Sequence, residues 1–141
     1  MTRMILASHH RMAEGLLDTL NYILPVHYPV CAVSAYLSDT PVEEDFKEVL
    51  KDADPNEQIL ILTDMMGGSV NQYCCRLLAE YPNLHIIAGM SLPLALGLAL
   101  QASNGPLSSE EITALVDDCR GQLVYVNKAM QAAAEDEEDD E

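Results

Sequence analysis

Residues 59–69, Ile-Leu-Ile-Leu-Thr-Asp-Met-Met-Gly-Gly-Ser, carry the strongest structural signal in the sequence. Five uncharged residues, too few for a stable helix of their own, lead to Asp64, and two glycines then open an amphipathic stretch. This order is typical of a buried parallel strand with a carboxylate at its carboxyl end. Ligands of open α/β sheets bind at that end, so Asp64 is a candidate site residue. Asp before a helix is also a common N-cap, and that purely structural interpretation stays open.

The composition indicates one domain with an acidic extension. The chain has 141 residues and a formal net charge of −16, which argues against nucleic acid as a partner. Seven acidic residues form the run 135–141, whose self-repulsion predicts a disordered tail. We expect a domain over residues 1–127 and a C-terminal extension over residues 128–141.

The sequence shows neither a targeting signal nor a membrane span. Its N-terminal residues lack the pattern of a signal peptide, and no apolar run reaches membrane-spanning length. The four cysteines have no metal-ligand spacing, which favours ordinary thiols in a reducing compartment. We expect a cytoplasmic protein.

Short apolar segments alternate with helical patterns along the chain. Strands are predicted at residues 4–7, 28–36, 59–63 and 84–89, with a late strand at residues 122–127. Helices are predicted at residues 12–23, 42–50, 70–80, 91–100 and 108–120. This alternation predicts an α/β fold with a doubly wound, mainly parallel sheet. Right-handed crossovers and short connections favour the strand order 2-1-3-4, with helices on both faces.

That strand order brings two distant segments together. The first and third strands become neighbours, and their following helices lie on opposite faces, which defines the switch point of the sheet. Ser8-His9-His10 follows the first strand, and Asp64 follows the third. We therefore expect His9 or His10 to share one crevice with Asp64.

A histidine beside a carboxylate has defined chemistry. A carboxylate that accepts a hydrogen bond from one imidazole nitrogen leaves the lone pair of the other nitrogen exposed, which makes the histidine a nucleophile or a base. Gly67-Gly68-Ser69 at a helix start offers unobstructed amides, a hydroxyl and the positive end of a helix dipole, all suited to a phosphate. The combination predicts phosphoryl transfer through a phosphohistidine.

Other chemistries fit the same residues less well. A hydrolase with Ser69 as nucleophile would lack the second glycine of a nucleophile elbow and a third partner in chain order. A metal site built from His9, His10, His27 and Asp64 would need His27 at the same end of the sheet, whereas His27 precedes the second strand at the opposite edge. We therefore expect no metal.

Three motifs add a more specific signal. They are Ile5-Leu6-Ala7-Ser8-His9 followed by Met12-Ala13-Glu14-Gly15-Leu16, then Leu62-Thr63-Asp64-Met65-Met66-Gly67-Gly68-Ser69, and then Ile87-Ala88-Gly89-Met90-Ser91-Leu92-Pro93. In this order they resemble the IIA domain of the mannose-type sugar phosphotransferase system. The resemblance covers nearly the whole chain except the acidic tail.

The resemblance implies a place in a phosphate relay. It implies that His9 takes a phosphoryl group from the histidine-containing phosphocarrier protein and passes it to a IIB subunit, which phosphorylates sugar entering through membrane IIC and IID subunits. It also implies that Asp64 is the partner of His9 and that Ser69 helps to hold the phosphoryl group. No cofactor is expected, because the phosphoryl group arrives activated. A cytoplasmic location, peripheral to the membrane transporter complex, would follow.

The resemblance also implies a homodimer. In this family a C-terminal strand crosses to the other subunit, and the late strand at residues 122–127, which lacks its own crossover, fits that role.

The chain departs from the family pattern near the motif histidine. His10 stands where the family usually has glycine, so two imidazoles compete for one role. We assign the role to His9, which follows Ser8 as the motif histidine follows its serine or threonine, and keep His10 as an accessory candidate. Met65-Met66 replaces a pair that often carries an aromatic residue, and Val70 stands where proline is frequent.

Three alternatives to a sugar-transport role stay open. The phosphocarrier subunit of a dihydroxyacetone kinase shares this fold and a strand-end histidine. A regulatory domain that senses phosphorylation and binds a signalling partner is different in kind. A flavodoxin-type ligand-binding module fits less well, because the first strand lacks a phosphate-binding loop and aromatic residues are scarce.

Overall fold

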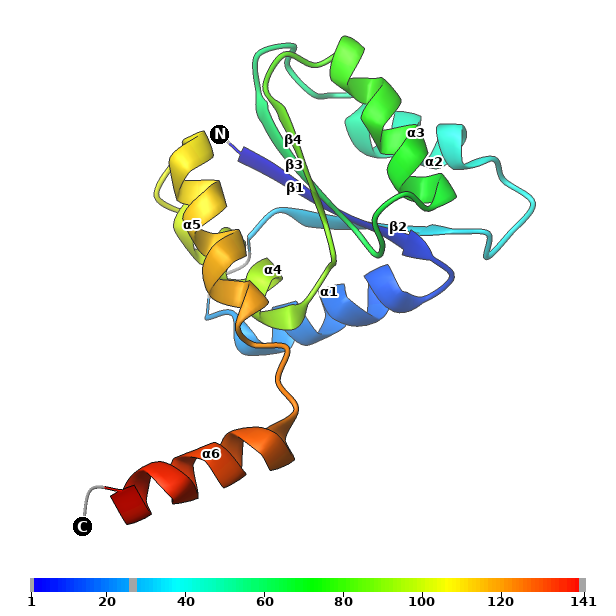
Figure 1. The fold of residues 1–141 in the computed structure, drawn as a ribbon. Coiled ribbons are helices and arrows are strands. Elements are labelled where there is room, and N and C mark those ends of the chain that lie inside the picture. Colours follow the sequence, from blue (N-terminus) through cyan, green and yellow to red (C-terminus); the bar gives the residue numbers. More distant parts are fainter. Residues whose placement is uncertain (1, 26–27, 140–141) are drawn as a thin grey trace.

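A computed structural model describes residues 2–25 and 28–139 (Figure 1). The elements, in chain order, are β1 (Thr2–His9), α1 (Met12–Ile23), β2 (Val30–Ala35), α2 (Val42–Leu50), β3 (Gln58–Thr63), α3 (Ser69–Arg76), the 3-10 turn η1 (Leu77–Ala79), β4 (Leu84–Ala88), α4 (Leu92–Ala102), α5 (Ser109–Arg120) and α6 (Val126–Asp139). Within these ranges no helix has the length and apolar content needed to cross a membrane.

The four strands form one parallel sheet. Their order is β2-β1-β3-β4, which confirms the predicted order 2-1-3-4 and the α/β fold class. In the sheet Ala7 pairs with Thr63 and His9 pairs with Ala35, so the carboxyl ends of β1, β2 and β3 lie together. Helices cover both faces, with α1, α4 and α5 on one and α2 and α3 on the other (Figure 1).

Alternate strand residues point into two separate cores. The first core packs against α1, α4 and α5 and takes from the sheet Met4, Leu6, Leu60, Leu62 and Ile87. The second packs against α2 and α3 and takes from the sheet Ile5, Ala7, Val33, Ala35, Ile59, Ile61 and Leu84. Because both faces are covered, every residue of β3 is buried, which accounts for the uninterrupted apolar run in the sequence.

The C-terminal segment differs from the prediction. Residues 123–125 have no regular structure and Val126 begins α6, so the predicted strand at residues 122–127 is wrong for the single chain. A strand needs a neighbour for its backbone hydrogen bonds, and no described strand lies beside this segment. The alanine-rich stretch that follows instead favours a helix.

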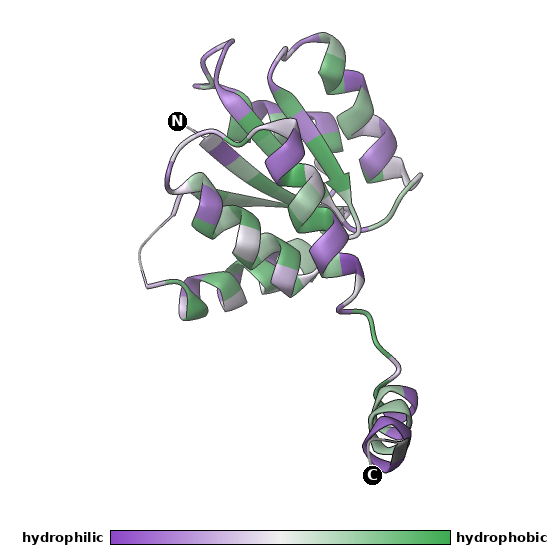
Figure 2. Ribbon diagram, turned by 60° about the vertical axis from the view of Figure 1, so that its left-hand side comes forward, coloured by the Kyte–Doolittle hydropathy of each residue, from purple (hydrophilic) through white to green (hydrophobic). Residues whose placement is uncertain are grey.

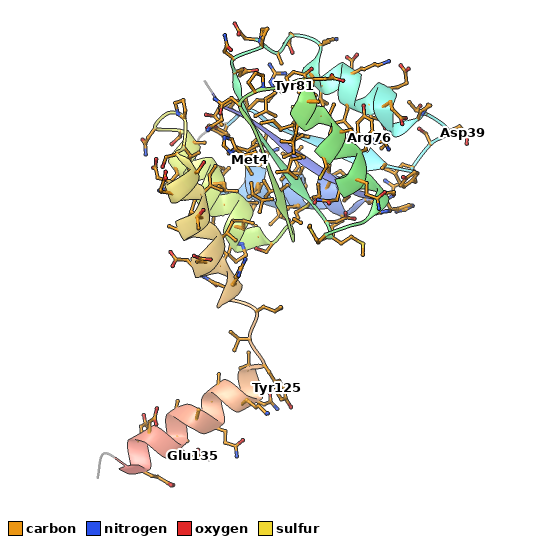
Figure 3. All side chains as sticks on the ribbon, turned by 45° about the horizontal axis from the view of Figure 1, so that its top comes forward. Met4, Asp39, Arg76, Tyr81, Tyr125 and Glu135 are labelled. Carbon is orange, nitrogen blue, oxygen red and sulfur yellow. The ribbon has the colours of Figure 1, made fainter. Side chains whose placement is uncertain are left out.

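Helix α6 projects from the domain. All described side chains from 121 to 138 are exposed, and the linker before α6 is apolar (Figure 2). Leu123 is 95% exposed, and Tyr125 lies at the start of the projecting helix (Figure 3). Residues 135–139, predicted to be disordered, continue α6, while residues 140–141 lie outside the described part of the chain. The strong helix formers before them extend the helix into the acidic run.

Candidate functional site

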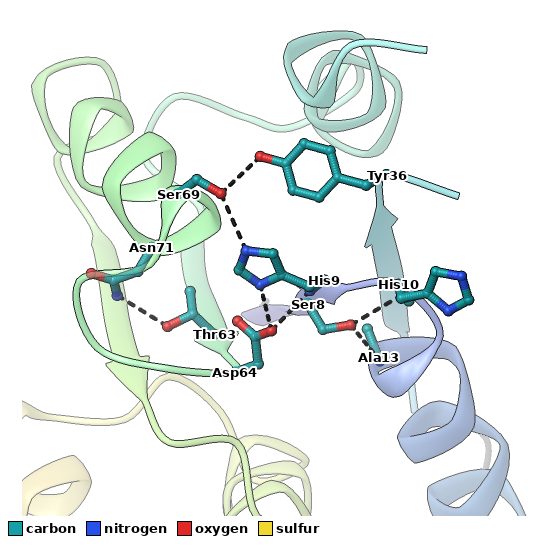
Figure 4. Close-up of polar contacts among 9 residues, drawn as sticks. All are labelled: Ser8, His9, His10, Ala13, Tyr36, Thr63, Asp64, Ser69 and Asn71. Carbon is teal, nitrogen blue, oxygen red and sulfur yellow. Dashed lines mark hydrogen bonds and ion pairs between the residues drawn. The ribbon is translucent and has the colours of Figure 1, made fainter. Parts of the chain in front are cut away.

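The candidate site lies at the carboxyl ends of three neighbouring strands (Figure 4). His9 is the last residue of β1, Tyr36 follows β2, and Asp64 follows β3. Because β1 lies between β2 and β3, these side chains converge where the strand order reverses. Open α/β sheets bind ligands at this position.

Asp64 holds His9 through two contacts to a single oxygen. The backbone amide of His9 donates to Asp64 Oδ2 at 2.8 Å, and His9 Nδ1 lies 2.8 Å from the same oxygen. An ionised carboxylate only accepts hydrogen bonds, so Nδ1 carries the proton and Nε2 presents its lone pair. The side chain of His9 is 39% exposed, which keeps the imidazole within reach of another protein.

Asp64 is set up to remain ionised. Burial on its own raises the pKa of Asp64, but the hydrogen bonds from the amide and ring of His9 outweigh it and hold that pKa below its ordinary value. Both side-chain hydrogen bonds that the structure shows for Asp64 go to His9, and the N-cap of α3 is Gly68. The N-cap interpretation of Asp64 therefore finds no support. Oδ1 of Asp64 is buried without a hydrogen-bond partner among the described residues.

The two glycines of the following loop serve different purposes. Gly67 has a φ of 77°, in the left-handed region that favours glycine, and its amide donates to Asn71 Oδ1 at 3.2 Å. A Cβ on Gly68 would lie 3.3 Å from His9 Cε1 and 3.0 Å from Met65 Cγ. Gly67 thus turns the chain, and Gly68 leaves room for the imidazole.

Ser69 begins α3 beside the free nitrogen of His9. Its Oγ lies 3.2 Å from His9 Nε2. The N-cap residue Gly68 provides no side-chain cap, so the first amides of α3 retain the capacity to bind an anion. The amide of Gly67 donates to Asn71 and is therefore not free for a phosphate. Of the phosphate-binding groups predicted at Gly67-Gly68-Ser69, the amides of Gly68 and Ser69 and the Ser69 hydroxyl remain.

His10 lies outside this cluster. Its exposed ring points away from His9 (Figure 4), and its amide donates to the carbonyl of Ala35 at 2.7 Å. The φ of His10 is 55°, a conformation that glycine adopts without strain. This backbone angle gives a physical reason for glycine at the position after the motif histidine.

The described residues contain no group of three or more His, Cys, Asp and Glu side chains arranged to hold a metal. His27, considered above as a metal ligand, lies outside the described residues.

Comparison with protein families agrees with this arrangement. The family EIIA-man, described as the PTS system fructose IIA component, matches residues 3–117. The chain belongs to this family. A IIA component of the mannose family acts in sugar phosphotransfer, and the dihydroxyacetone-kinase and regulatory alternatives are not favoured.

Solved structures of similar fold include other PTS proteins. A protein of Klebsiella pneumoniae described as a phosphoenolpyruvate-dependent sugar PTS permease superposes on this IIA component with a TM-score of 0.82 at 25% identity, covering 92% of this chain and 93% of that one. The mannose/sorbose specific IIA subunit of Enterococcus faecalis gives 0.74 at 26% identity, with 87% and 92% covered. Component EIIA of Streptococcus agalactiae, at 20% identity, shares the fold, with a TM-score of 0.76 and coverage of 91% and 99%.

Two polar residues of the IIA site were not predicted from the sequence. Tyr36 Oη lies 2.8 Å from Ser69 Oγ, and the buried Asn71 donates to Thr63 Oγ1 at 3.0 Å while accepting from the Gly67 amide. The strand order could have placed Tyr36 at the site, because β2 lies next to β1 and Tyr36 lies at the end of β2, beside His9. Asn71 had a weaker signal, a polar residue in the first turn of an amphipathic helix.

Proposed function

We propose that His9 of this IIA component accepts a phosphoryl group on Nε2 from the histidine-containing phosphocarrier protein and passes it to a IIB subunit. The contact of Nδ1 with Asp64 supports this assignment, because it leaves the Nε2 lone pair facing Ser69 and the N-terminus of α3. The IIB subunit would then phosphorylate sugar that enters through membrane IIC and IID subunits. This role places the protein in the cytoplasm beside the transporter.

The transfer needs positioning and charge stabilisation. The Nε2 lone pair attacks phosphorus in line, the bond from phosphorus to the donor's nitrogen breaks, and the electron pair stays with the donor imidazole. The Nδ1 proton remains on His9, where Asp64 stabilises the positive charge that develops on the ring. The amides of Gly68 and Ser69 offset charge on the phosphoryl oxygens. Transfer to IIB is the same step in reverse.

The proposal extends to a dimer of IIA domains. Residues 1–127 would form the phosphocarrier domain, with residues 122–127 pairing with the sheet of a second copy and residues 128–141 as an extension. The apolar and exposed linker supports this arrangement, since Leu123, Tyr125 and Val126 are 95%, 66% and 59% exposed in the single chain. Sedimentation equilibrium tests it: a dimer that dissociates when Leu123 is replaced by Asp agrees with the proposal, and a wild-type monomer contradicts it.

A labelling experiment tests the acceptor. The protein is incubated with radiolabelled phosphoenolpyruvate, its phosphotransferase and the phosphocarrier protein, and it should gain one acid-labile, base-stable phosphate. His9→Ala should remove the label, whereas His10→Ala, the matched control, should retain it. Undiminished label in His9→Ala would refute the assignment. Chase with a purified IIB subunit should return the protein to its unlabelled form.

A further inference from the structure

Tyr36 occupies an unusual backbone conformation at the edge of the site. Its φ is 68°, in the left-handed region that bulky side chains rarely adopt. Tyr36 follows β2 directly, and its side chain is directed toward Ser69 and His9 (Figure 4). The residue is 56% exposed, so burial in the core does not explain this conformation.

Tyr36 extends the hydrogen-bonded chain of the site to four residues. Its hydroxyl lies 2.8 Å from Ser69 Oγ, which in turn lies 3.2 Å from His9 Nε2. The centroid of the Tyr36 ring also lies 5.5 Å from that of His9. Tyr36 therefore contacts both the imidazole and the hydroxyl beside its nucleophilic nitrogen.

Asp64 sets the direction of every hydrogen bond in this chain. Because the carboxylate only accepts, His9 Nδ1 donates to it and Nε2 is an acceptor. Ser69 then donates to Nε2, and its oxygen is left to accept from the Tyr36 hydroxyl. Tyr36 thus holds the oxygen of Ser69 without using the proton of Ser69.

We propose that Tyr36 is a positioning residue that fixes Ser69 for the phosphorylated state of His9. This inference rests on the function proposed above. When a phosphoryl group occupies Nε2, the Ser69 hydroxyl loses its acceptor there and turns its proton to a phosphoryl oxygen. The hydrogen bond from Tyr36 to the Ser69 oxygen persists through that turn. No covalent bond of Tyr36 or Ser69 forms or breaks.

The variant Tyr36→Phe isolates the hydroxyl. It keeps the ring beside His9 and removes only the donor to Ser69. Single-turnover transfer from the phosphorylated carrier protein should fall about three- to tenfold in maximal rate, the effect of one neutral hydrogen bond, at unchanged half-saturating carrier concentration. Tyr22→Phe, at a residue of α1 that is 90% exposed, is the matched control and should leave the rate unaltered.

A double-mutant cycle with Ser69→Ala separates positioning from other roles. In the Ser69→Ala background, Tyr36→Phe should have no further effect, because the group that it positions is gone. Equal effects in both backgrounds, or a raised half-saturating concentration at an unchanged maximal rate, would overturn the proposal. Wild-type protein that accepts no phosphate would refute the proposed function itself, whereas equal rates for wild type and Tyr36→Phe would refute only the role of Tyr36.

Discussion

Asp64 receives the backbone amide and the ring Nδ1 of His9 on one and the same oxygen, each at 2.8 Å. The main-chain contact fixes where β1 ends, and the ring contact fixes the tautomer and direction of the imidazole. One carboxylate thus determines both the position and the protonation of the proposed phosphoryl acceptor.

Replacing Asp64 by Asn should slow phosphoryl transfer while leaving the fold intact. The amide oxygen can take the place of Oδ2, but hydrogen bonds to a charged acceptor are stronger by about 1 kcal/mol each than neutral ones. Loss of the charge should therefore reduce the transfer rate about tenfold or more. Stopped-flow or quench-flow transfer from the phosphorylated carrier measures this, with Asp18→Asn on the exposed side of α1 as control. An unchanged rate would remove the charge of Asp64 from the mechanism.

The contribution of Asp64 to stability should depend on pH. Because the pKa of Asp64 is lower in the folded than in the unfolded chain, its stabilisation is complete above the unfolded pKa of about 3.9 and is lost as pH falls through the folded pKa. Urea unfolding of wild type and Asp64→Asn should thus show a free-energy difference that shrinks as pH falls from about 5 to below the unfolded pKa of about 3.9. A difference constant over this range would mean that the pKa of Asp64 is not lowered.

Gly68→Ala should impair transfer by displacing the imidazole. The new methyl group would lie 3.3 Å from His9 Cε1 and 3.0 Å from Met65 Cγ, distances at which the imidazole and the Met65 side chain must each give way slightly. Because a misplacement of 1 Å can cost about a hundredfold in rate, the smaller shift expected here should reduce the rate by less than about a hundredfold. Gly15→Ala is the control, since its Cβ meets nothing within 4 Å and should stabilise α1 by about 1 kcal/mol at an unaltered rate. Similar rates in both variants would show that the ring tolerates a Cβ at residue 68.

His10→Gly should stabilise the protein and leave transfer unaffected. An L-residue with a φ of 55° has a left-handed backbone that costs about 1–2 kcal/mol, and glycine removes most of that cost. The free energy of unfolding in urea should rise by about 1 kcal/mol. His10→Ala keeps the Cβ and should show no such gain, which separates backbone strain from loss of the imidazole. A transfer defect in both variants would instead make His10 an accessory residue of the site.

The fold was predictable because its signals are local and repeated. The apolar run of β3 and the helical spacing of α1 and α2 determined the elements, and the handedness of crossovers determined the strand order. The segment at residues 122–127 was mispredicted because its apolar residues show only that these residue types favour the extended conformation of a strand. It does not show that a neighbouring strand is present to pair with it.

The site residues that lie at the ends of strands could be predicted from the sequence. The roles of residues that depend on backbone angles and interatomic distances could not. Strand order alone brought either His9 or His10 to Asp64, and the choice of His9 came from the family resemblance, in which the motif histidine follows a serine or threonine. The difference between Gly67, whose amide is taken by Asn71, and Gly68, which borders the imidazole, depends on distances that the sequence does not contain. The left-handed backbone that turns Tyr36 toward Ser69 is likewise invisible in residue types.

Three of the side chains that meet at the site, those of His9, Tyr36 and Asp64, lie where strands of the sheet end. The sheet therefore fixes the positions of these side chains, and the loops farther from the site have little influence on them. Those outer loops can lengthen, shrink or exchange residues without disturbing the reactive nitrogen.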